Sequence, residues 1–314
     1  TMIESLTLNE GITVIHDKAF YECSSLKSMK VPTTVETIGS YAWRNCSEMT
    51  SIQLPKVTEL SEELLYACSK LTEIVIPDSV IKIGAHAFNG CTGITSLTIP
   101  DQVLVIERNA FYGCTGIKTV RLSANLKSIG GSAFEGCTGI TVLTLPSNLE
   151  TIGSGAFKNV QITTVVVPKS VTSIGIGAFQ GCPLESITLP FVGANRTVSE
   201  VCSSAGGMYL FGYIFGEDSY YSGEYHYTSS PTPPGSTERL IYQGQPYSRT
   251  TSGTYYYKAY YSRYYIPASL KTVVITDATG ISANAFYGCT MIESLTLNEG
   301  ITVIHDKAFY ECSS

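Results

Sequence analysis

Apolar and polar positions alternate in short stretches that recur along most of the chain. In one such stretch Ile94, Leu97 and Ile99 are separated by polar residues, and Pro100 follows. Alternation with period two predicts a β-strand with one buried face, and proline, which has no N–H, suits the end of that strand. We expect equivalent strands over residues 26–31, 71–76, 140–145 and 184–189.

Two further elements follow each predicted strand. The first is a Val-x-x-Ile-Gly segment, as at Val80, Ile83 and Gly84, in which the glycine is expected to form a corner. The second is Ala-Phe-x-x-Cys, which is too short for a stable helix. We expect it to form one helical or 3₁₀ turn that directs Phe and Cys inward.

The Ala-Phe-x-x-Cys signature returns with a step of about 23 residues, the separation of Cys91 and Cys114. Complete copies end at Cys23, Cys91, Cys114, Cys137, Cys182, Cys289 and Cys312. Three imperfect copies carry Trp43 or Leu65 in place of Phe, or Val160 in place of Cys. A fixed period in this range indicates a repeat architecture.

A single repeat is too small to fold alone. Burying one large apolar side chain contributes about 1.5 to 3 kcal/mol, whereas ordering the backbone costs about 1 to 2 kcal/mol per residue. Neighbouring repeats must therefore stack with like residues in contact, so that Phe, Cys and Leu/Ile each form a ladder. The pattern predicts a solenoid of about ten coils.

The repeat L-x-x-[IV]-x-[IL]-P-x-x-[VL]-x-x-I-G-x-x-A-F-x-x-C resembles the BspA-like class of leucine-rich repeats, found on surface proteins of mucosal and gut microbes. The resemblance covers residues 1–190 and 270–314. It implies a curved leucine-rich repeat solenoid, mostly short β-strands with one short helical turn per repeat. It also implies an extracellular, cell-surface location and adhesion to a protein or glycan of a host cell or matrix.

The repeat pattern is interrupted between residues 191 and 269. This stretch holds 15 of the chain's 21 tyrosines, all between positions 209 and 265. We expect degenerate coils with a tyrosine- and glycine-rich insertion of one or two hairpins. The predicted organisation is thus repeats over 1–190, the insertion region over 191–269 and repeats over 270–314, within one continuous solenoid.

Two surfaces are candidates for binding. Tyrosine offers a large contact area at low entropic cost, so the insertion supplies Tyr220, Tyr221, Tyr225, Tyr227, Tyr255, Tyr256 and Tyr257 as candidate contact residues. The alternative use of these tyrosines is packing against the solenoid. The second surface is the outward face of the strands, formed by Lys30, Gln53, Val75, Thr98, Arg121, Thr144, Val166 and Thr188. Strand propensity alone also explains those residues.

Charge and titratable residues argue against several classes of function. The net charge is −6 with scattered basic residues, which disfavours nucleic acid as a partner. No apolar run is long enough for a transmembrane helix. His16, His86 and His305 occupy repeat positions, which leaves His226 as the one histidine outside the pattern. We expect no enzyme activity, because acid–base and nucleophilic enzymes usually place such a residue beside a second reactive group.

Nine of the ten cysteines occupy the same slot of the repeat, and Cys202 lies outside it. Stacked coils hold equivalent Cβ atoms parallel and farther apart than the roughly 3.5 to 4.5 Å that a disulfide requires. We therefore expect buried thiols that behave as small hydrophobic side chains. No C-x-x-C pair is present, so no metal or other cofactor is predicted.

Residues 290–314 repeat residues 1–25 without a single difference, including solvent positions such as Glu4 and Glu293. Other copies share only the core positions, so we expect this identity to reflect tandem blocks of 289 residues in a longer surface protein. An assignment artefact is the alternative. Uncapped terminal coils would favour end-to-end self-association. The function classes left open are a binding module and a structural spacer or stalk.

Overall fold

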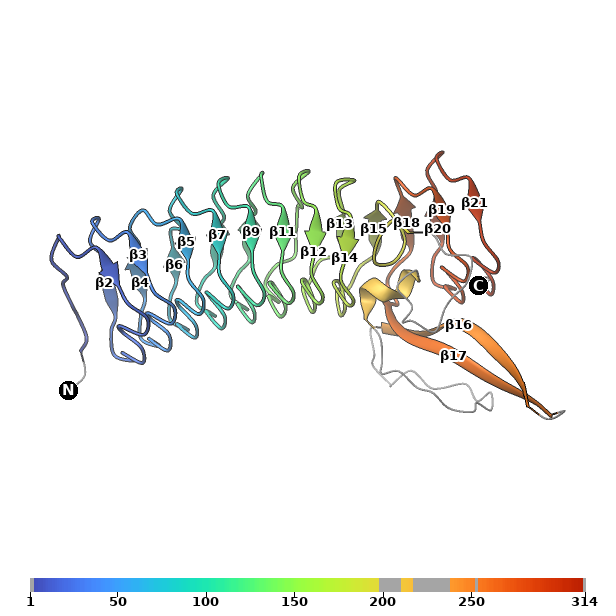
Figure 1. Cartoon of the computed structure of the whole chain (residues 1–314), viewed down its shortest axis with the longest axis horizontal. Coiled ribbons are helices and arrows are strands. Elements are labelled where there is room, and N and C mark those ends of the chain that lie inside the picture. The colour runs from blue at the N-terminus through green and yellow to red at the C-terminus, as the bar shows by residue number, and fades with distance from the viewer. Residues whose placement is uncertain (1–2, 198–209, 217–237, 252–253, 313–314) are drawn as a thin grey trace. The chain divides into compact units, whose positions relative to one another are not determined.

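A computed structural model of the chain describes residues 3–197, 210–216, 238–251 and 254–312. The chain divides into two units, residues 1–162 and 163–314. Both units are parallel β-solenoids, in which strands of successive coils lie side by side (Figure 1). The predicted repeat solenoid is confirmed. The boundaries at residues 190 and 269 remain a prediction.

Most coils of the first unit contribute two short strands, one from each apolar segment of the repeat. The strand that we expected over residues 140–145 is not formed. Strands at the first position are β2 (Ser28–Lys30), β4 (Ser51–Gln53), β6 (Glu73–Ile74), β8 (Ser96–Thr98) and β10 (Thr119–Arg121). Strands at the second position are β1 (Val14–Ile15), β3 (Thr37–Ile38), β5 (Glu59–Leu60), β7 (Lys82–Ile83), β9 (Val105–Ile106), β11 (Ser128–Ile129) and β12 (Thr151–Ile152). Pairing is parallel, mostly with a 23-residue offset such as Lys82↔Val105.

The second unit has the same coils and two additional elements. Its coil strands are β13 (Thr164–Val166), β14 (Ser173–Ile174), β15 (Ser186–Leu189), β18 (Thr272–Ile275), β19 (Gly280–Ile281), β20 (Ser294–Thr296) and β21 (Val303–Ile304). The additional elements are the 3₁₀ helix η1 (Phe211–Phe215) and an antiparallel hairpin of β16 (Glu238–Thr251) and β17 (Thr254–Pro267). One parallel sheet runs in the order β13-β15-β18-β20.

The Ala-Phe-x-x-Cys segment is a run of turns in the described coils, not the helical turn that we predicted. Every second N–H donates to a carbonyl of the next coil, as from Phe88 to Ala110 at 2.8 Å. The intervening N–H groups donate three residues back, as from Cys91 to Phe88 at 3.1 Å. Hydrogen bonds between coils use N–H groups that a helix would need for itself. The backbone therefore does not keep helical angles, and His86 adopts φ 57°.

The core is built from the predicted ladders. Phe88, Phe111, Phe134 and Phe157 stack with ring centroids 5.2, 5.3 and 5.7 Å apart. In the imperfect second coil, Trp43 stacks on Phe20 at 5.6 Å. All five of the rings from Trp43 to Phe157 are at most 1% exposed. Like residues therefore meet across coils, as the stacking argument requires.

The cysteine slot lies beside this aromatic ladder. The nine described cysteines are thiols, and among the described residues none forms a disulfide. The Cys114 thiol donates to the Phe88 carbonyl oxygen of the preceding coil at 3.0 Å, and Cys91 and Cys137 make the equivalent bond. Burial raises the pKa of the Cys114 thiol to about 12. The expectation of buried thiols is confirmed for seven cysteines of this slot, whereas Cys23 and Cys312 are half-buried.

Glycine in the Ile-Gly slot permits close approach between coils. A Cβ added to Gly130 would lie 2.4 Å from the backbone nitrogen of Arg108, and one added to Gly84 would lie 2.6 Å from the Leu60 carbonyl oxygen. These two glycines do not adopt left-handed backbone angles. Their role is thus contact with the preceding coil, in addition to the corner that we expected.

Candidate functional site

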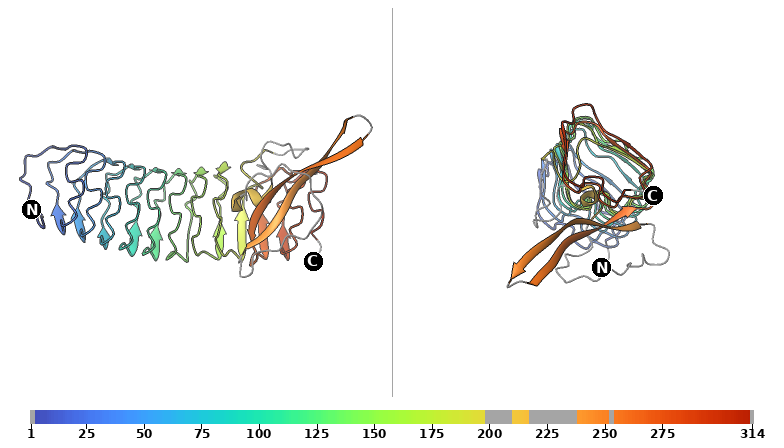
Figure 2. Two further views of the ribbon diagram at one scale, coloured as in Figure 1. Left: turned by 90° about the horizontal axis from the view of Figure 1, so that it is seen from below. Right: turned by 90° about the vertical axis from the view of Figure 1, so that its right-hand side faces the viewer.

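The hairpin is the feature that departs most from the repeat. β16 and β17 pair over their full length, from Glu238↔Pro267 to Thr251↔Thr254. Figures 1 and 2 both show its closed end pointing away from the coils of the second unit. Among the candidate tyrosines, Tyr255, Tyr256 and Tyr257 lie in β17 at this end, opposite Thr250, Arg249 and Ser248.

The remaining candidate tyrosines lie outside the described residues. They are Tyr220, Tyr221, Tyr225 and Tyr227. His226 and Cys202 also lie outside them. The hypothesis that these tyrosines bind a partner therefore stays a prediction.

The base of the hairpin is seated in the second unit. Tyr264 is 0% exposed, and its ring lies against Gly212, where an added Cβ would be 2.3 Å from the Tyr264 Cγ atom. The Tyr265 N–H donates to the Gly216 carbonyl oxygen at 3.3 Å. Gly216 adopts φ 88°, a conformation that favours glycine. Gly212 and Gly216 thus serve the junction between η1 and β17.

η1 takes the place of a coil's turn segment. The N–H of Phe179 donates to the Ile214 carbonyl oxygen at 2.9 Å, and the N–H of Phe211 donates to that of Ala285 at 2.9 Å. The Phe211 ring lies 4.9 Å from the Phe286 ring, in the line of the aromatic ladder. Sequence reasoning missed this role because Phe211 lacks the Ala and Cys neighbours of the repeat.

Arg196 links coils on either side of the inserted region. Its guanidinium forms an ion pair with Asp277 and donates to the Asp277 carbonyl oxygen at 3.1 Å. It also donates to the Lys169 carbonyl oxygen and lies 5.7 Å from the centre of the Phe191 ring. Arg196 and Asp277 are 81 residues apart, and no local pattern in the sequence signals the contact.

The outward strand face is the second candidate surface. Its predicted residues are exposed except Thr188, which is half-buried. The most exposed large apolar side chains on this face are Val75, Val142 and Val166, at 80%, 74% and 64%. Isolated exposed apolar residues are normal on protein surfaces, so exposure alone does not identify a site.

A groove lies beside Val75, where β6 and β8 of successive coils are not paired with each other. It encloses about 770 Å³ and is lined by Glu73, Val75, Asp78, Pro100, Asp101 and Arg121, among others. Missing strand pairing at this point leaves space between the two coils. The preceding coil step, Ser51↔Glu73, is 22 residues rather than 23, and its two strands pair.

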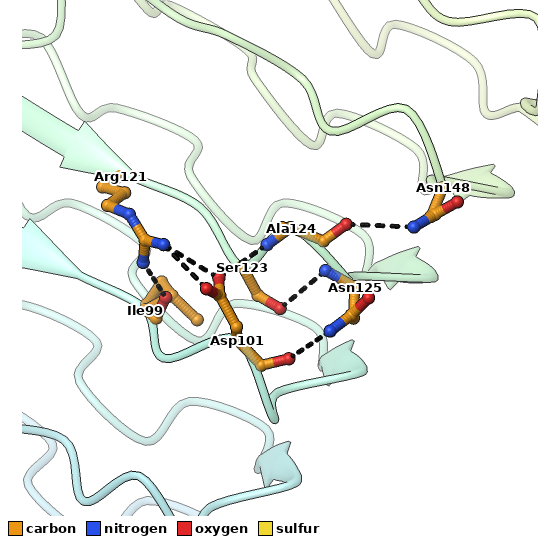
Figure 3. A network of polar contacts seen from close by, with 7 residues as sticks. All are labelled: Ile99, Asp101, Arg121, Ser123, Ala124, Asn125 and Asn148. Carbon is orange, nitrogen blue, oxygen red and sulfur yellow. Dashed lines mark hydrogen bonds and ion pairs between the residues drawn. The ribbon is translucent and has the colours of Figure 1, made fainter.

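A polar network borders the groove (Figure 3). The Arg121 guanidinium donates to both carboxylate oxygens of Asp101 at 2.8 and 3.0 Å and to the Ile99 carbonyl oxygen at 3.3 Å. Asp101 also accepts from the Ala124 N–H at 2.9 Å, and this bond followed by the Arg121 contact lowers the pKa of Asp101. The arrangement fixes Arg121 against its neighbours, so its role at this position is structural.

His86 is held by polar side chains of the coils. His86 contacts the amide nitrogens of Asn89 and Asn109 at 3.2 and 3.3 Å. Burial, followed by the nearby charge of Arg108, lowers the pKa of His86. No nucleophile or carboxylate pairs with this imidazole among its described contacts, and no cluster of His, Cys, Asp or Glu in the described part of the chain is suited to a metal ion. None of the described helices has the length and apolar character to cross a membrane.

Comparison with protein families assigns the repeats to a known family. The model of the BspA type leucine rich repeat region matches in six copies over residues 1–103, 58–186 and 258–314, well over half of the chain. No curated protein matches the sequence. The family and fold are typically non-enzymatic.

Several solved structures of bacterial leucine-rich repeat proteins are similar to this chain. A leucine-rich repeat protein from Bacteroides ovatus ATCC 8483 is 20% identical with a TM-score of 0.55, over 98% of this chain and 75% of that chain. A leucine rich cell surface protein from Faecalibacterium prausnitzii A2-165 is 23% identical with a TM-score of 0.47, over 99% and 77%. The T. pallidum leucine rich repeat protein is 28% identical with a TM-score of 0.45, over 57% and 76%. The first of these supports the solenoid fold.

Proposed function

Because the chain belongs to the BspA-type leucine-rich repeat family, we propose that it is a non-enzymatic binding module at a cell surface, with a protein or glycan of a host cell or matrix as partner. The family suggests a protein-interaction or surface module in general. Adhesion and the class of partner are the specific parts of the proposal. The hairpin and its adjoining tyrosines are the proposed contact element.

The observation that carries this proposal is the direct pairing of β15 with β18. Ser186 pairs with Thr272 and Leu189 with Ile275, so the parallel sheet passes over the intervening chain without a gap. The hairpin adds no strand to that sheet. A segment that the sheet does not need, yet which is anchored by a fully buried Tyr264, is best explained by a role outside the fold.

Composition supports the same choice of surface. Tyrosine combines a large, rigid contact area with a hydroxyl group, and serine and glycine add adaptable hydrogen bonding. Tyr255, Tyr256 and Tyr257 lie next to the closed end of the hairpin. A spacer or stalk, the rival function, has no use for such a cluster.

The test compares two triple substitutions on an array of matrix proteins and host-type glycans. One variant replaces Tyr255, Tyr256 and Tyr257 by Ser. The matched control replaces three coil tyrosines by Ser, namely Tyr21, Tyr112 and Tyr310, which are 37%, 41% and 50% exposed. Because hot-spot aromatic residues carry most binding energy, the hairpin variant should lose at least about tenfold in affinity while the control binds normally. Equal binding by both variants, or no binding by the parent chain, favours the spacer.

A further inference from the structure

The hydrogen bond at the base of the hairpin reveals which way the backbone of β17 faces. In an antiparallel pair the N–H and C=O of one residue point to the same side, and this side alternates along the strand. The Tyr265 N–H donates to the carbonyl oxygen of Gly216, which lies outside the hairpin. The backbone N–H and C=O of Tyr265 therefore point away from β16. The backbone groups of residues at steps of two along β17 point the same way. These residues are Tyr255, Tyr257, Ala259, Tyr261 and Arg263.

The position of Pro246 gives an independent check. Pro246 lies opposite Ala259 in the register of the hairpin. Proline is tolerated in a sheet where its nitrogen faces away from the partner strand, and opposite residues in an antiparallel pair face the same way relative to their partners. Ala259 is therefore also outward-facing, which agrees with the direction deduced from Tyr265.

The two edges of the hairpin are not equivalent. On β16, Pro246 removes a donor near the middle of the outer edge. On β17, no proline occurs from Thr254 to Ile266. Within the described part of the chain no third strand pairs with either edge. A long unpaired edge is a template for an added strand, and a two-stranded hairpin alone is marginally stable in water. The edge of β17 is thus the one able to accept a strand.

Charge indicates the chemistry of that added strand. The hairpin contains one acidic residue, Glu238, and four basic residues, Arg239, Arg249, Lys258 and Arg263. The whole chain, in contrast, has a net charge of −6. A second hairpin of the same chain would bring like charges together, which is unfavourable across strands. An acidic segment is complementary.

We propose that the outer edge of β17 binds an extended acidic segment of a partner protein by β-strand addition. The backbone groups of Tyr255, Tyr257, Ala259 and Tyr261 form the ladder, and alternate side chains of the partner supply specificity. This inference rests on the proposed function, since it assigns the hairpin a mode of binding and a protein partner rather than a glycan.

The test measures fluorescence anisotropy of a labelled peptide, Thr-Glu-Val-Glu-Thr-Glu-Val, with the full chain. Ala259→Pro removes one outward N–H and leaves the bonds to β16 intact, as Pro246 already does on the other strand. Ala259→Ser is the matched control that keeps the N–H. We expect binding by the parent chain and by Ala259→Ser, and about a tenfold loss in Ala259→Pro, with the thermal unfolding temperatures of all three alike.

Two modified peptides separate strand addition from charge alone. A depsipeptide with esters in place of its central amides keeps every side chain but lacks N–H donors, and it should bind about tenfold more weakly. A lysine version should not bind. Equal binding of the depsipeptide, no binding of the acidic peptide, or undiminished peptide binding by the Ala259→Pro variant overturns the proposal.

If the parent chain dimerises without peptide and Ala259→Pro abolishes that dimer, the edge binds a second copy of the chain and the proposal is overturned. If the tyrosine variant loses array binding while Ala259→Pro retains it, the proposed function stands and strand addition does not.

Discussion

The coils around Phe111 and the hairpin of β16 and β17 are stabilised in different ways. In the coils, strand β9 pairs with β7 of the preceding coil and β11 of the following coil, and the Phe111 ring stacks on both neighbours at 5.2 and 5.3 Å. In the hairpin, the two strands pair only with each other among the described residues. Coil residues are thus constrained by copies about 23 positions away, whereas hairpin residues are constrained by a cross-strand partner and by the base.

This difference explains where sequence variation is tolerated. A coil that changes its Phe, Cys or Gly slot disturbs two interfaces, because stability in a repeat array is shared between nearest neighbours. A hairpin that changes residues near its closed end disturbs no coil. Specific recognition is therefore easier to evolve on the hairpin than in the core of the solenoid.

Truncating the aromatic ladder should have the largest effect. Phe111→Ala removes a fully buried ring that contacts rings on both sides, and such truncations cost about 3 to 5 kcal/mol. Tyr112→Ala, at the adjacent position that is 41% exposed, should cost about 0.5 kcal/mol or less. Urea unfolding followed by circular dichroism measures both. Similar losses for the two variants would show that the ladder does not stabilise the coils.

Closing the space between coils should come next. Gly130→Ala places a Cβ 2.4 Å from the Arg108 backbone nitrogen, and overpacking of this kind costs about 1 to 3 kcal/mol. Gly131→Ala is the matched control, because its Cβ meets its nearest atom, the Ser154 carbonyl oxygen, at 3.3 Å. The thermal unfolding temperature of Gly130→Ala should be lower than that of Gly131→Ala. The reverse order would contradict the role assigned to the Ile-Gly slot.

Loosening the base of the hairpin should affect the hairpin more than the coils. Gly212→Ala brings a methyl group against the buried Tyr264 ring, 2.3 Å from its Cγ atom, and about 1 to 3 kcal/mol of strain is expected locally. Hydrogen exchange should accelerate in β17 while the amides of β8 and β9 keep their protection. Uniform acceleration across the coils would mean that the hairpin is part of the core.

Replacing one buried thiol should have the smallest effect at neutral pH. Val160 already occupies the cysteine slot in one coil, so Cys114→Val should cost about 1 kcal/mol or less. The slot also predicts a pH dependence. Burial raises the pKa of Cys114 from 9.0 to about 12, so the folded chain holds this proton longer than the unfolded chain.

It follows that stability is fully present below about pH 9 and is lost as pH rises toward about 12. Burial also raises the pKa values of Cys91 and Cys137 well above 9.0, so several thiols add to the loss. Unfolding free energies measured between pH 8 and pH 11 should fall less steeply for Cys114→Val than for the parent chain. Parallel curves would contradict this assignment.

The sequence was sufficient for the parts of the fold that repeat. Most strand positions, the Phe ladder and the thiol slot follow from a period that places like residues in contact, as at Phe88, Phe111 and Phe134. The local backbone of the turn segment did not follow, because its N–H groups are shared with the next coil and so depend on stacking. Positive φ occurs at Asn109, a residue type that enters the left-handed region more often than most, but also at Tyr41 and Glu63, so residue type alone does not locate it.

The region between β15 and β18 was the least predictable. Phe211 enters the aromatic ladder from a 3₁₀ helix without the repeat's neighbours, and Arg196 contacts Asp277 across 81 residues. Tyrosine content identified the region as unusual, but only the register with Pro246 and the Tyr265 bond distinguish its two edges. Such features depend on long-range packing, which a periodic pattern does not encode.

The most direct test of the central claim is deletion of residues 217–262. Gly216 and Tyr265 are hydrogen-bonded at the base, so a short glycine linker can join the cut ends without straining the coils. Binding of this variant to the matrix-protein and glycan array is then compared with that of the parent chain. We expect the deletion variant to keep the circular dichroism unfolding transition of the parent chain and to lose binding. Unchanged binding by the folded deletion variant would contradict a binding role for the hairpin.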